Sequence, residues 1–365
     1  MRVMFVDDEQ RVLDGIERSM FGLDVDWELA FATSGRSALE QLTATPAQAV
    51  ISDMRMPGMD GRELLTEVRS RWPDTLRVIL SGFTEEEIAL RSLEVVHQFL
   101  AKPCDGPSLV AVVERIASLR KLLASESLKR IVGRVGHLPS TPRIYLDLVR
   151  SVTNANSNAK SIAPILSRDP ALAAKVLQVA NSAFFRRGKP IANIGAAVTH
   201  IGLDTLRALI LMMEVFRADS DEGAAAHLQQ RALRATLIAE HVAAGETCAN
   251  ECAVAALLAD VGQLIPGIEI HCKQAETNGE GTFRPSEVGA YLLGMWGLPM
   301  FIIEAVAYYE TPWRVTPQSF GIAGVAHVAA MLARGKMPDV DYVTRCGFAD
   351  RLDGWRAFAE KLPGP

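Results

Sequence analysis

The first 120 residues repeat one pattern five times: a short apolar run that ends in polar residues, then a stretch with the apolar spacing of an amphipathic helix. In the first unit the run at 2–6 leads into Asp7 and Asp8, and Val12, Ile16 and Met20 then share one helical face. We expect strands at 2–6, 27–32, 47–52, 77–80 and 98–101, and helices at 10–20, 35–42, 61–71, 85–95 and 107–123. This alternation predicts a doubly wound, five-stranded parallel sheet.

Polar side chains follow four of these expected strands, at the point where each strand ends. They are Asp7, Asp8, Asp53, Ser81 and Lys102. In an open parallel sheet, ligands bind outside the carboxyl ends of the strands. Three carboxylates at one edge repel one another, and a hard divalent cation with oxygen ligands, here Mg²⁺, relieves that repulsion. A hydroxyl and an ammonium beside them complete a cradle for a phosphoryl group.

Four stretches at these strand ends, FVDDE, ISDMRMPGMDG, ILSGF and FLAKP, resemble the receiver domain of two-component response regulators. The resemblance covers residues 1 to about 120 and implies a flavodoxin-like α/β receiver fold. It implies that Asp53 accepts the phosphoryl group. It also implies that Asp7, Asp8, Asp53 and the backbone carbonyl of Arg55 hold Mg²⁺.

The same resemblance assigns roles to three further residues. Ser81 and Lys102 would bind the phosphoryl oxygens, and Ser81 and Phe99 would change conformation on phosphorylation. Phe99 lacks the hydroxyl of the tyrosine often found at its position, so its switch would act through packing alone. A carboxylate nucleophile of this kind needs positioning and charge neutralisation more than a strong base.

An apolar stripe connects this region to the rest of the chain. Its members step by three and four residues: Leu109, Val112, Ile116, Leu119 and Leu123. The stripe either packs on the sheet as the last receiver helix or extends as the seam of a homodimer. We place the receiver at 1–122, a helical linker at 123–136, and a second domain at 137–365.

The second domain shows helix patterns and no convincing strand. Asp169 and Pro170 are an expected N-cap and first helical residue. Further helices are expected at 193–199, 204–216, 224–244, 250–264, 285–295, 299–308, 321–332 and 348–362. The stretches SRDPALAAKVLQVANSAFF, HIGLDTLRALIL and SEVGAYLLGMWGLP resemble the HDOD domain, a non-catalytic relative of the HD phosphohydrolases. The resemblance implies an all-α output domain.

The expected metal site of HD enzymes is incomplete in this sequence. Those enzymes use histidines, an adjacent His-Asp pair and a further aspartate around a catalytic cation. Here the pair reads Ala259-Asp260, and Arg231 stands where a histidine is expected. The resemblance therefore implies a domain without catalytic metal. The alternative is a metal-dependent phosphohydrolase acting on cyclic dinucleotides, which the missing histidines argue against.

A polar and aromatic cluster is the candidate surface of the second domain. It comprises Asn181, Ser182, Phe184 and Phe185, followed by two arginines. The cluster either docks a partner or an acidic small molecule, or consists of core phenylalanines beside a solvated basic loop. The sequence leaves both interpretations open.

Bulk properties bound the function classes. The 365 residues, 49% hydrophobic and 22% charged, suffice for two domains, and no apolar run approaches the roughly 20 residues of a membrane span. The N-terminus does not resemble a secretory signal, so we expect a cytoplasmic protein. A net charge of −5 argues against nucleic acid as a partner. The two resemblances imply a sensor histidine kinase or phosphotransfer protein, and enzymes of cyclic-di-GMP signalling, as partners. Apart from the receiver's own phosphorylation and dephosphorylation, no catalysis is expected.

Overall fold

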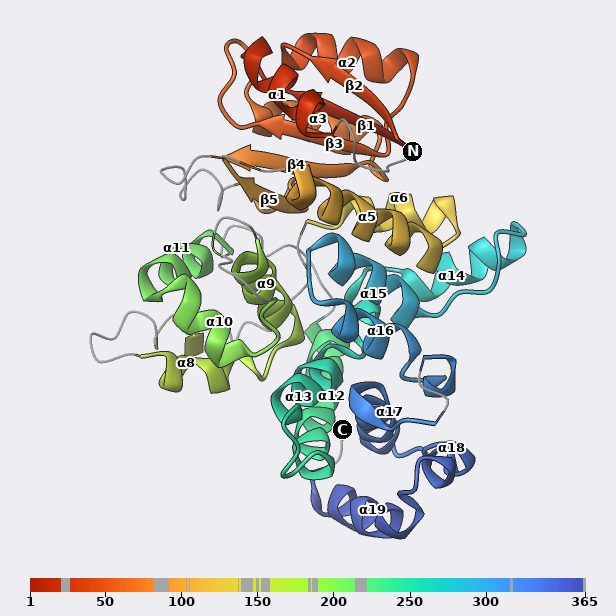
Figure 1. Cartoon of the computed structure of the whole chain (residues 1–365). Helices are drawn as coiled ribbons and strands as arrows, with labels where there is room; N and C mark the ends of the chain where they lie inside the picture. Colours follow the sequence, from red (N-terminus) through yellow and green to blue (C-terminus); the bar gives the residue numbers. More distant parts are fainter. Residues whose placement is uncertain are drawn as a thin grey trace.

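The structure is a computed structural model that describes residues 1–20, 27–81, 92–102, 104, 106–136, 138, 147–148, 151, 158–182, 185, 190–213, 222–315 and 318–363. Its N-terminal part is a parallel sheet in the order β2-β1-β3-β4-β5 (Figure 1). The strands are β1 (Arg2–Val6), β2 (Glu28–Ala32), β3 (Ala49–Asp53), β4 (Leu76–Ser81) and β5 (Gln98–Ala101). The expected fold class of this region is confirmed.

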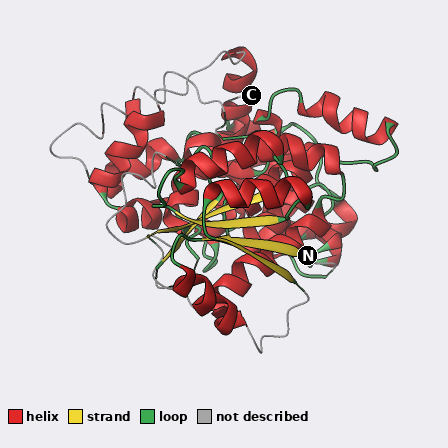
Figure 2. Ribbon diagram, turned by 90° about the horizontal axis from the view of Figure 1, so that it is seen from above, coloured by secondary structure: helices red, strands yellow, loops and turns green. Residues whose placement is uncertain are grey.

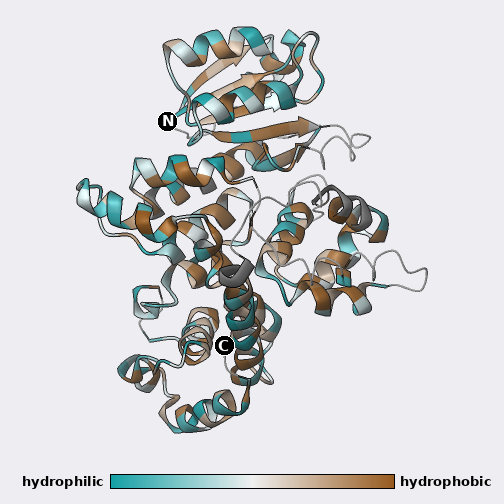
Figure 3. Cartoon of the chain, turned by 180° about the vertical axis from the view of Figure 1, so that it is seen from behind, coloured by the Kyte–Doolittle hydropathy of each residue, from teal (hydrophilic) through white to brown (hydrophobic). Residues whose placement is uncertain are grey.

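Helices cover both faces of the sheet (Figure 2). They are α1 (Gln10–Met20), α2 (Gly35–Ala44), α3 (Gly61–Arg71) and α5 (Gly106–Leu122). Because alternate residues of a strand point to opposite faces, Val3 and Phe5 pack with Leu13 of α1, whereas Met4 packs with Leu64 of α3. Figure 3 shows apolar strands enclosed by helices of mixed character. Most of the helix expected at 85–95 lies outside the described residues.

In its described residues, the second part contains helices and no strand, as expected. They are α8 (Ala159–Leu166), α9 (Pro170–Asn181), α10 (Ile194–Ile201), α11 (Leu203–Met213), α12 (Glu222–Val242), α13 (Ala249–Leu258), η2 (Val261–Leu264), α14 (Ile268–Thr277), α15 (Pro285–Met295), α16 (Met300–Tyr308), η3 (Pro312–Arg314), α17 (Gly321–Ala333), α18 (Val340–Arg345), η4 (Ala349–Arg351) and α19 (Leu352–Lys361). Asp169 caps α9 by accepting hydrogen bonds from the amides of Ala171 (2.9 Å) and Leu172 (3.1 Å). Every residue of α9 is buried, so this helix lies at the centre of the domain.

The apolar stripe of the connector packs within the chain, and the homodimer seam stays a prediction. Leu109 packs in the core beneath the sheet, as expected for the last receiver helix. Leu119 and Leu123 belong instead to a core shared with the second domain, where Leu119 lies against Gly294 of α15. The helical conformation is interrupted at residues 123–125, which separate α5 from α6 (Glu126–Arg134). The second half of the stripe therefore attaches the two domains to each other.

The domains share one continuous apolar core. It runs from Met4 and Ile79 of the sheet, through Val132 of α6, to Leu177 of α9 and Leu292 of α15. A second core joins α12 and α17 to α18 and α19 around Ile238, Tyr342 and Trp355. The receiver is thus packed on the helical domain (Figure 1).

Three helices were not expected from the sequence, and one expected helix is interrupted. The missed helices are α8, which has Pro164 in its interior, α14 and α18. The helix expected at 250–264 ends at Leu258 and continues as η2. The reason is packing: a Cβ on Gly262 would lie 1.8 Å from the carbonyl oxygen of Pro285, so the η2 backbone touches α15 directly.

No single described helix is long and apolar enough to cross a bilayer, although α13 with η2 and α14, bent by 70°, pass a test of length and composition as a pair.

Candidate functional site

The sheet register brings three predicted site residues to one edge. Asp7 follows β1, Asp53 ends β3, and Lys102 follows β5. Lys102 Nζ lies 2.7 Å from Asp7 Oδ2 and also forms an ion pair with Asp53 Oδ1. β1 pairs with β3, and β4 pairs with β5, in parallel. Because parallel strands in register end at the same edge of the sheet, the three side chains come together there. The ammonium therefore links the two carboxylates.

Burial controls the electrostatics of this edge. Asp7 is 1% exposed and Asp53 is 8% exposed. Burial raises the pKa of Asp53 and the Asp7 charge adds to it, while Lys102 and the amide of Arg55 oppose the rise. Burial alone would lower the pKa of Lys102, but hydrogen bonds and charges from both carboxylates outweigh it and raise that pKa. The edge combines a buried, partly accessible carboxylate with a firmly charged ammonium.

The other receiver predictions fare differently. Arg55 contributes its amide, which donates to Asp53 Oδ2 at 2.8 Å; its predicted metal-binding carbonyl stays a prediction. Asp8 is exposed. Phe99 is buried at 3% exposure within the shared core. Ser81 pairs with Ala101 at the end of β4, and its side chain lies outside the described residues.

Metal ligands are a separate question. In the described parts of the chain, no three His, Cys, Asp or Glu side chains gather in a group that could hold a metal ion. Asp8 consequently does not join Asp7 and Asp53 in such a group. The oxygen chemistry of the two paired carboxylates nevertheless suits Mg²⁺. The predicted Mg²⁺ site remains a prediction.

In the second domain, Asp260 is held by two arginines. Arg231 Nε of α12 donates to Asp260 Oδ2 at 2.6 Å, and Arg334 Nη2 at the end of α17 donates to Asp260 Oδ1. The hydroxyl of Tyr309 donates to Asp260 Oδ1 at 3.1 Å. A second bond from Arg231 Nη2 reaches Gln263 Oε1 at 2.6 Å. We call Asp260, Arg231, Arg334 and Tyr309 the arginine cluster.

The charged side chains of the arginine cluster are mostly buried, and two of the three are cationic. The side chains of Asp260, Arg231 and Arg334 are 10%, 14% and 9% exposed. Burial raises the pKa of Tyr309 well above its usual value and Asp260 adds to this, so the phenol stays a donor. Burial would lower the pKa of Arg334, but Asp260 and Tyr309 raise it. The guanidinium of Arg334 also lies 4.7 Å from the Tyr309 ring centroid.

The structure places the other predicted residues of this site as follows. Ala259 is buried at 2% exposure and offers no ligand atom beside Asp260. The sequence pointed to Arg231 as the replacement for an expected histidine. It gave no indication of Arg334, which is 74 residues from Asp260 along the chain.

The predicted surface around residue 181 is wrong for two of its members. Asn181 and Ser182 are buried at 6% and 7% exposure. Asn181 exchanges hydrogen bonds with the backbone of Ile191, and Ser182 donates to the carbonyl of Val179 at 2.7 Å. Both side chains satisfy backbone groups at the end of α9. Phe185 is half-buried against the shared core, and Phe184 lies outside the described residues.

A buried polar joint connects the domains next to β5. Lys175 Nζ of α9 donates to the carbonyl oxygens of Leu93 (2.9 Å) and Gly136 (3.0 Å). Its ammonium lies 5.0 Å from the Trp296 ring centroid. Gln178 donates to the carbonyl of His97 at 3.2 Å, and Gln98 donates to the carbonyl of Met295 at 3.1 Å. We call Lys175, Gln178 and Gln98 the joint residues.

Arg77 of β4 supports the joint from the receiver side. It is fully buried and donates to the carbonyl oxygens of Val95 (2.6 Å), Pro73 (3.0 Å), Thr75 (3.1 Å) and Gly133 (2.6 Å). Burial lowers the pKa of Arg77, but these four acceptors favour its charged form. One side chain thus ties β4 to α6 and to the segment that precedes β5.

Two known domain families match this chain, one in each of its two parts. Residues 3–114 match the model of the response regulator receiver domain, and residues 138–280 match the model of the HDOD domain. The hydrogenase transcriptional regulatory protein HoxA of Cupriavidus necator is 32% identical over 122 residues, 33% of this chain and 25% of HoxA. The uncharacterized transcriptional regulatory protein YesN of Bacillus subtilis is 30% identical over 187 residues, 49% of this chain and 47% of YesN. The matches thus span about a quarter to a half of these relatives.

Two solved structures are also similar. An uncharacterized protein from Neptuniibacter caesariensis is 37% identical, with a TM-score of 0.31 over 33% of this chain and 91% of that chain. The MmoQ response regulator from Methylococcus capsulatus is 20% identical, with a TM-score of 0.49 over 60% of this chain and 98% of that chain. Taken with the sheet edge and the two matched models, the chain belongs to the response regulators, with an N-terminal receiver domain followed by an HDOD domain.

Proposed function

We propose that this protein is a phosphorylation-controlled switch in which Asp53 accepts a phosphoryl group from a histidine kinase or phosphotransfer protein in the cytoplasm. The observation that carries the proposal is the linkage of Asp7 and Asp53 through Lys102 at the carboxyl edge of the sheet. An Asp53 oxygen forms the new bond to phosphorus as the bond from phosphorus to the donor nitrogen breaks. Lys102 then neutralises charge on the phosphoryl oxygens.

Mg²⁺ belongs to this proposal. Asp7, Asp8, Asp53 and the carbonyl of Arg55 would hold it, and the ion would supply further charge neutralisation for the transferred group. Lys102 now holds both buried carboxylates, so it must share them when the ion binds. Asp8 is exposed and forms no group of ligands with Asp7 and Asp53 in the described structure, so it would have to turn towards them when the ion binds.

We further propose that the HDOD domain acts by binding proteins rather than by catalysis. The arginine cluster supports this, because both oxygens of Asp260 are already bound by the guanidinium groups of Arg231 and Arg334. A divalent cation at that position would face two guanidinium groups. The alternative, hydrolysis of cyclic dinucleotides, requires the histidines that Ala259 and Arg231 replace.

The joint supports a route from Asp53 to the HDOD domain. The joint residues bind the segment that runs directly into β5, and β5 carries Phe99 and leads to Lys102. A change at Lys102 on phosphorylation would therefore act on the strand that α9 and α15 hold. We propose that phosphorylation alters this contact and so exposes or covers an HDOD surface, with enzymes of cyclic-di-GMP signalling among the candidate partners.

The phosphoacceptor is tested by labelling the full chain with a small acyl phosphate and Mg²⁺ and measuring the intact mass. We expect one phosphoryl group on the wild type and on the control Asp14→Asn, and none on Asp53→Asn. Equal labelling of Asp53→Asn would refute the assignment.

The coupling is tested by hydrogen exchange of the α9 amides with and without the acyl phosphate. We expect a change in exchange at α9 in the wild type and no change in Asp53→Asn. Labelling of Asp53 without any change at α9 or α15 would refute the coupling and leave the phosphoacceptor intact.

A further inference from the structure

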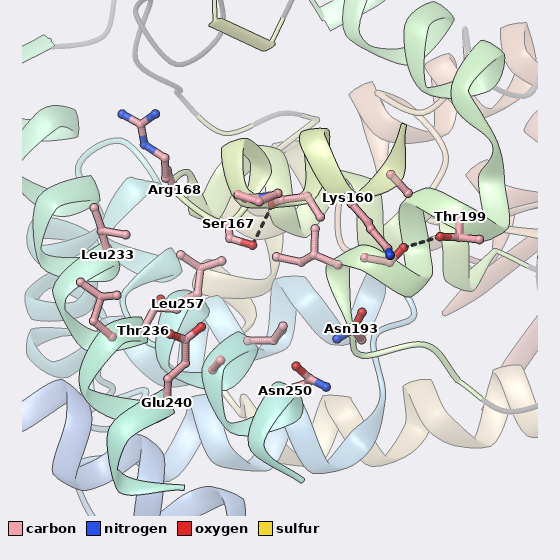
Figure 4. Close-up of a pocket in the computed structure, with 18 residues that line it drawn as sticks. Lys160, Ser167, Arg168, Asn193, Thr199, Leu233, Thr236, Glu240, Asn250 and Leu257 are labelled. Carbon is pink, nitrogen blue, oxygen red and sulfur yellow. Dashed lines mark hydrogen bonds between the residues drawn. The ribbon is translucent and has the colours of Figure 1, made fainter. Parts of the chain in front are cut away.

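A cavity of about 610 Å³ opens inside the HDOD domain, away from both sites described above. One wall comes from α8 and α10, and the other comes from α12 and α13 (Figure 4). On α12 the lining residues Leu233, Thr236, Leu237 and Glu240 follow the spacing of one helical face. This volume lies within the range of small-molecule sites, roughly 300–1,000 Å³.

The floor of the cavity is aliphatic. Leu233, Leu237 and Leu257 line it from α12 and α13, and Ile194 lines it from α10. Leu237 is 37% exposed. A single exposed leucine is common on protein surfaces and does not by itself indicate a binding site. None of the 18 described residues that line the cavity is aromatic. The floor therefore suits an alkyl chain and offers no ring on which a nucleobase could stack.

The charges of the cavity are separated in space. Figure 4 shows Lys160 and Thr199 towards one end, Arg168 towards the other, and Glu240 on the opposite wall. Arg168 lies 3.9 Å from the carboxylate of Asp147, whereas Lys160 is exposed in the first turn of α8. A helix N-terminus favours an anion, and Lys160 lies in the first turn of α8. The Lys160 end is thus the place for a negative head group.

We propose that this cavity binds a small amphiphilic anion, an alkyl or acyl chain that ends in a carboxylate or phosphate. The chain lies over Leu233, Leu237 and Leu257, and the head group pairs with Lys160. Glu240 repels the head group from the opposite wall and so fixes the direction in which the ligand lies.

The probe is cis-parinaric acid, a fluorescent fatty acid, titrated against the full chain below its micellar concentration. Dodecanoate, dodecyl phosphate and dodecyltrimethylammonium are then used as competitors. We expect the two anions to displace the probe and the cation to fail; the better anion identifies the head group. Lengthening the competitor from octanoate to decanoate should tighten binding about fifteenfold, since each of the two added methylenes contributes about fourfold when buried.

Variants locate the site. Lys160→Gln should weaken the probe about tenfold through the loss of a charge-assisted contact, and Lys160→Arg should restore most of the affinity. Glu240→Gln should tighten binding about twofold to threefold. Leu237→Asn should weaken binding of the probe. Lys273→Gln on α14 is the matched surface control and should leave the affinity unchanged. Melting curves confirm that each variant folds.

Two results would overturn the proposal. One is the absence of saturable binding of the probe to the full chain. The other is displacement by the cationic competitor as readily as by the anions, with Lys160→Gln and Leu237→Asn binding like the control variant.

Discussion

Replacement of Asp260 by alanine tests whether this residue now has a structural role. The change removes the only carboxylate that Arg231 and Arg334 share within the arginine cluster, and it removes the acceptor of the Tyr309 hydroxyl. All three charged side chains are at most 14% exposed, so water replaces little of the loss. Removal of one partner from a buried ion pair costs about 3–5 kcal/mol. At about 2–4 °C per kcal/mol for a domain of this size, the melting temperature should fall by about 6–20 °C.

The assay is thermal unfolding of the full chain, followed by circular dichroism, with and without a chelator. We expect the same loss in both conditions, because the cluster needs no cation. Asp341→Ala, which removes an exposed acid on α18, is the control and should change stability by less than about 0.5 kcal/mol. If Asp260→Ala melted like the control, or lost stability only when divalent cations were present, the structural role would be wrong.

Three further predictions concern the contact between the domains. Burial lowers the pKa of Lys175 to about 7, whereas an unfolded lysine keeps its proton to about pH 10.4. Between these pH values the unfolded state binds more protons than the folded state, so the free energy of unfolding rises with pH. Denaturant unfolding at several pH values should show a steeper rise in the wild type than in Lys175→Met. Arg77→Met should cost about 3–5 kcal/mol in the same assay, because four buried carbonyl oxygens lose their donor; a loss below about 1 kcal/mol would contradict its supporting role. Gly133→Ala should push α6 away from the receiver, since the new Cβ would lie 1.7 Å from the carbonyl oxygen of Pro73; unchanged proteolysis of the linker would count against it.

The sheet could be predicted closely from the sequence because its signals are local. Each strand is a short apolar run that a polar residue or a turn ends, and β1, β5, α1 and α3 have the expected bounds. The missed helices lack such signals. Pro164 inside α8 cannot donate a backbone hydrogen bond, and α14 is largely polar along IEIHCKQAET. Packing against neighbouring helices, which no short window reveals, decides these segments.

The two sites differ in predictability for the same reason. Asp7, Asp53 and Lys102 end strands of one parallel sheet, so the topology brings them together once the strands are recognised. The joint and the arginine cluster depend on distant pairs such as Gln98 with Met295 and Asp260 with Arg334. The surface predicted around Asn181 failed because a polar side chain next to phenylalanines was interpreted as exposed. In the structure it satisfies buried backbone groups instead.

The arginine cluster shows that the HDOD site differs from an HD metal site in charge as well as in ligands. A metal site gathers anionic or neutral donors around a divalent cation, whereas here two guanidinium groups already bind Asp260. At roughly 5 Å and an effective dielectric constant of about 20, each guanidinium would oppose a divalent cation by about 7 kcal/mol. Supplying histidines through Ala259→His and Arg231→His should therefore fail to create a metal site while Arg334 remains. Only a further change of Arg334 to a neutral residue should permit Mn²⁺ or Zn²⁺ to raise the melting temperature of the domain. Metal binding by the double variant alone, measured by calorimetry, would show that missing ligands and not charge prevent it.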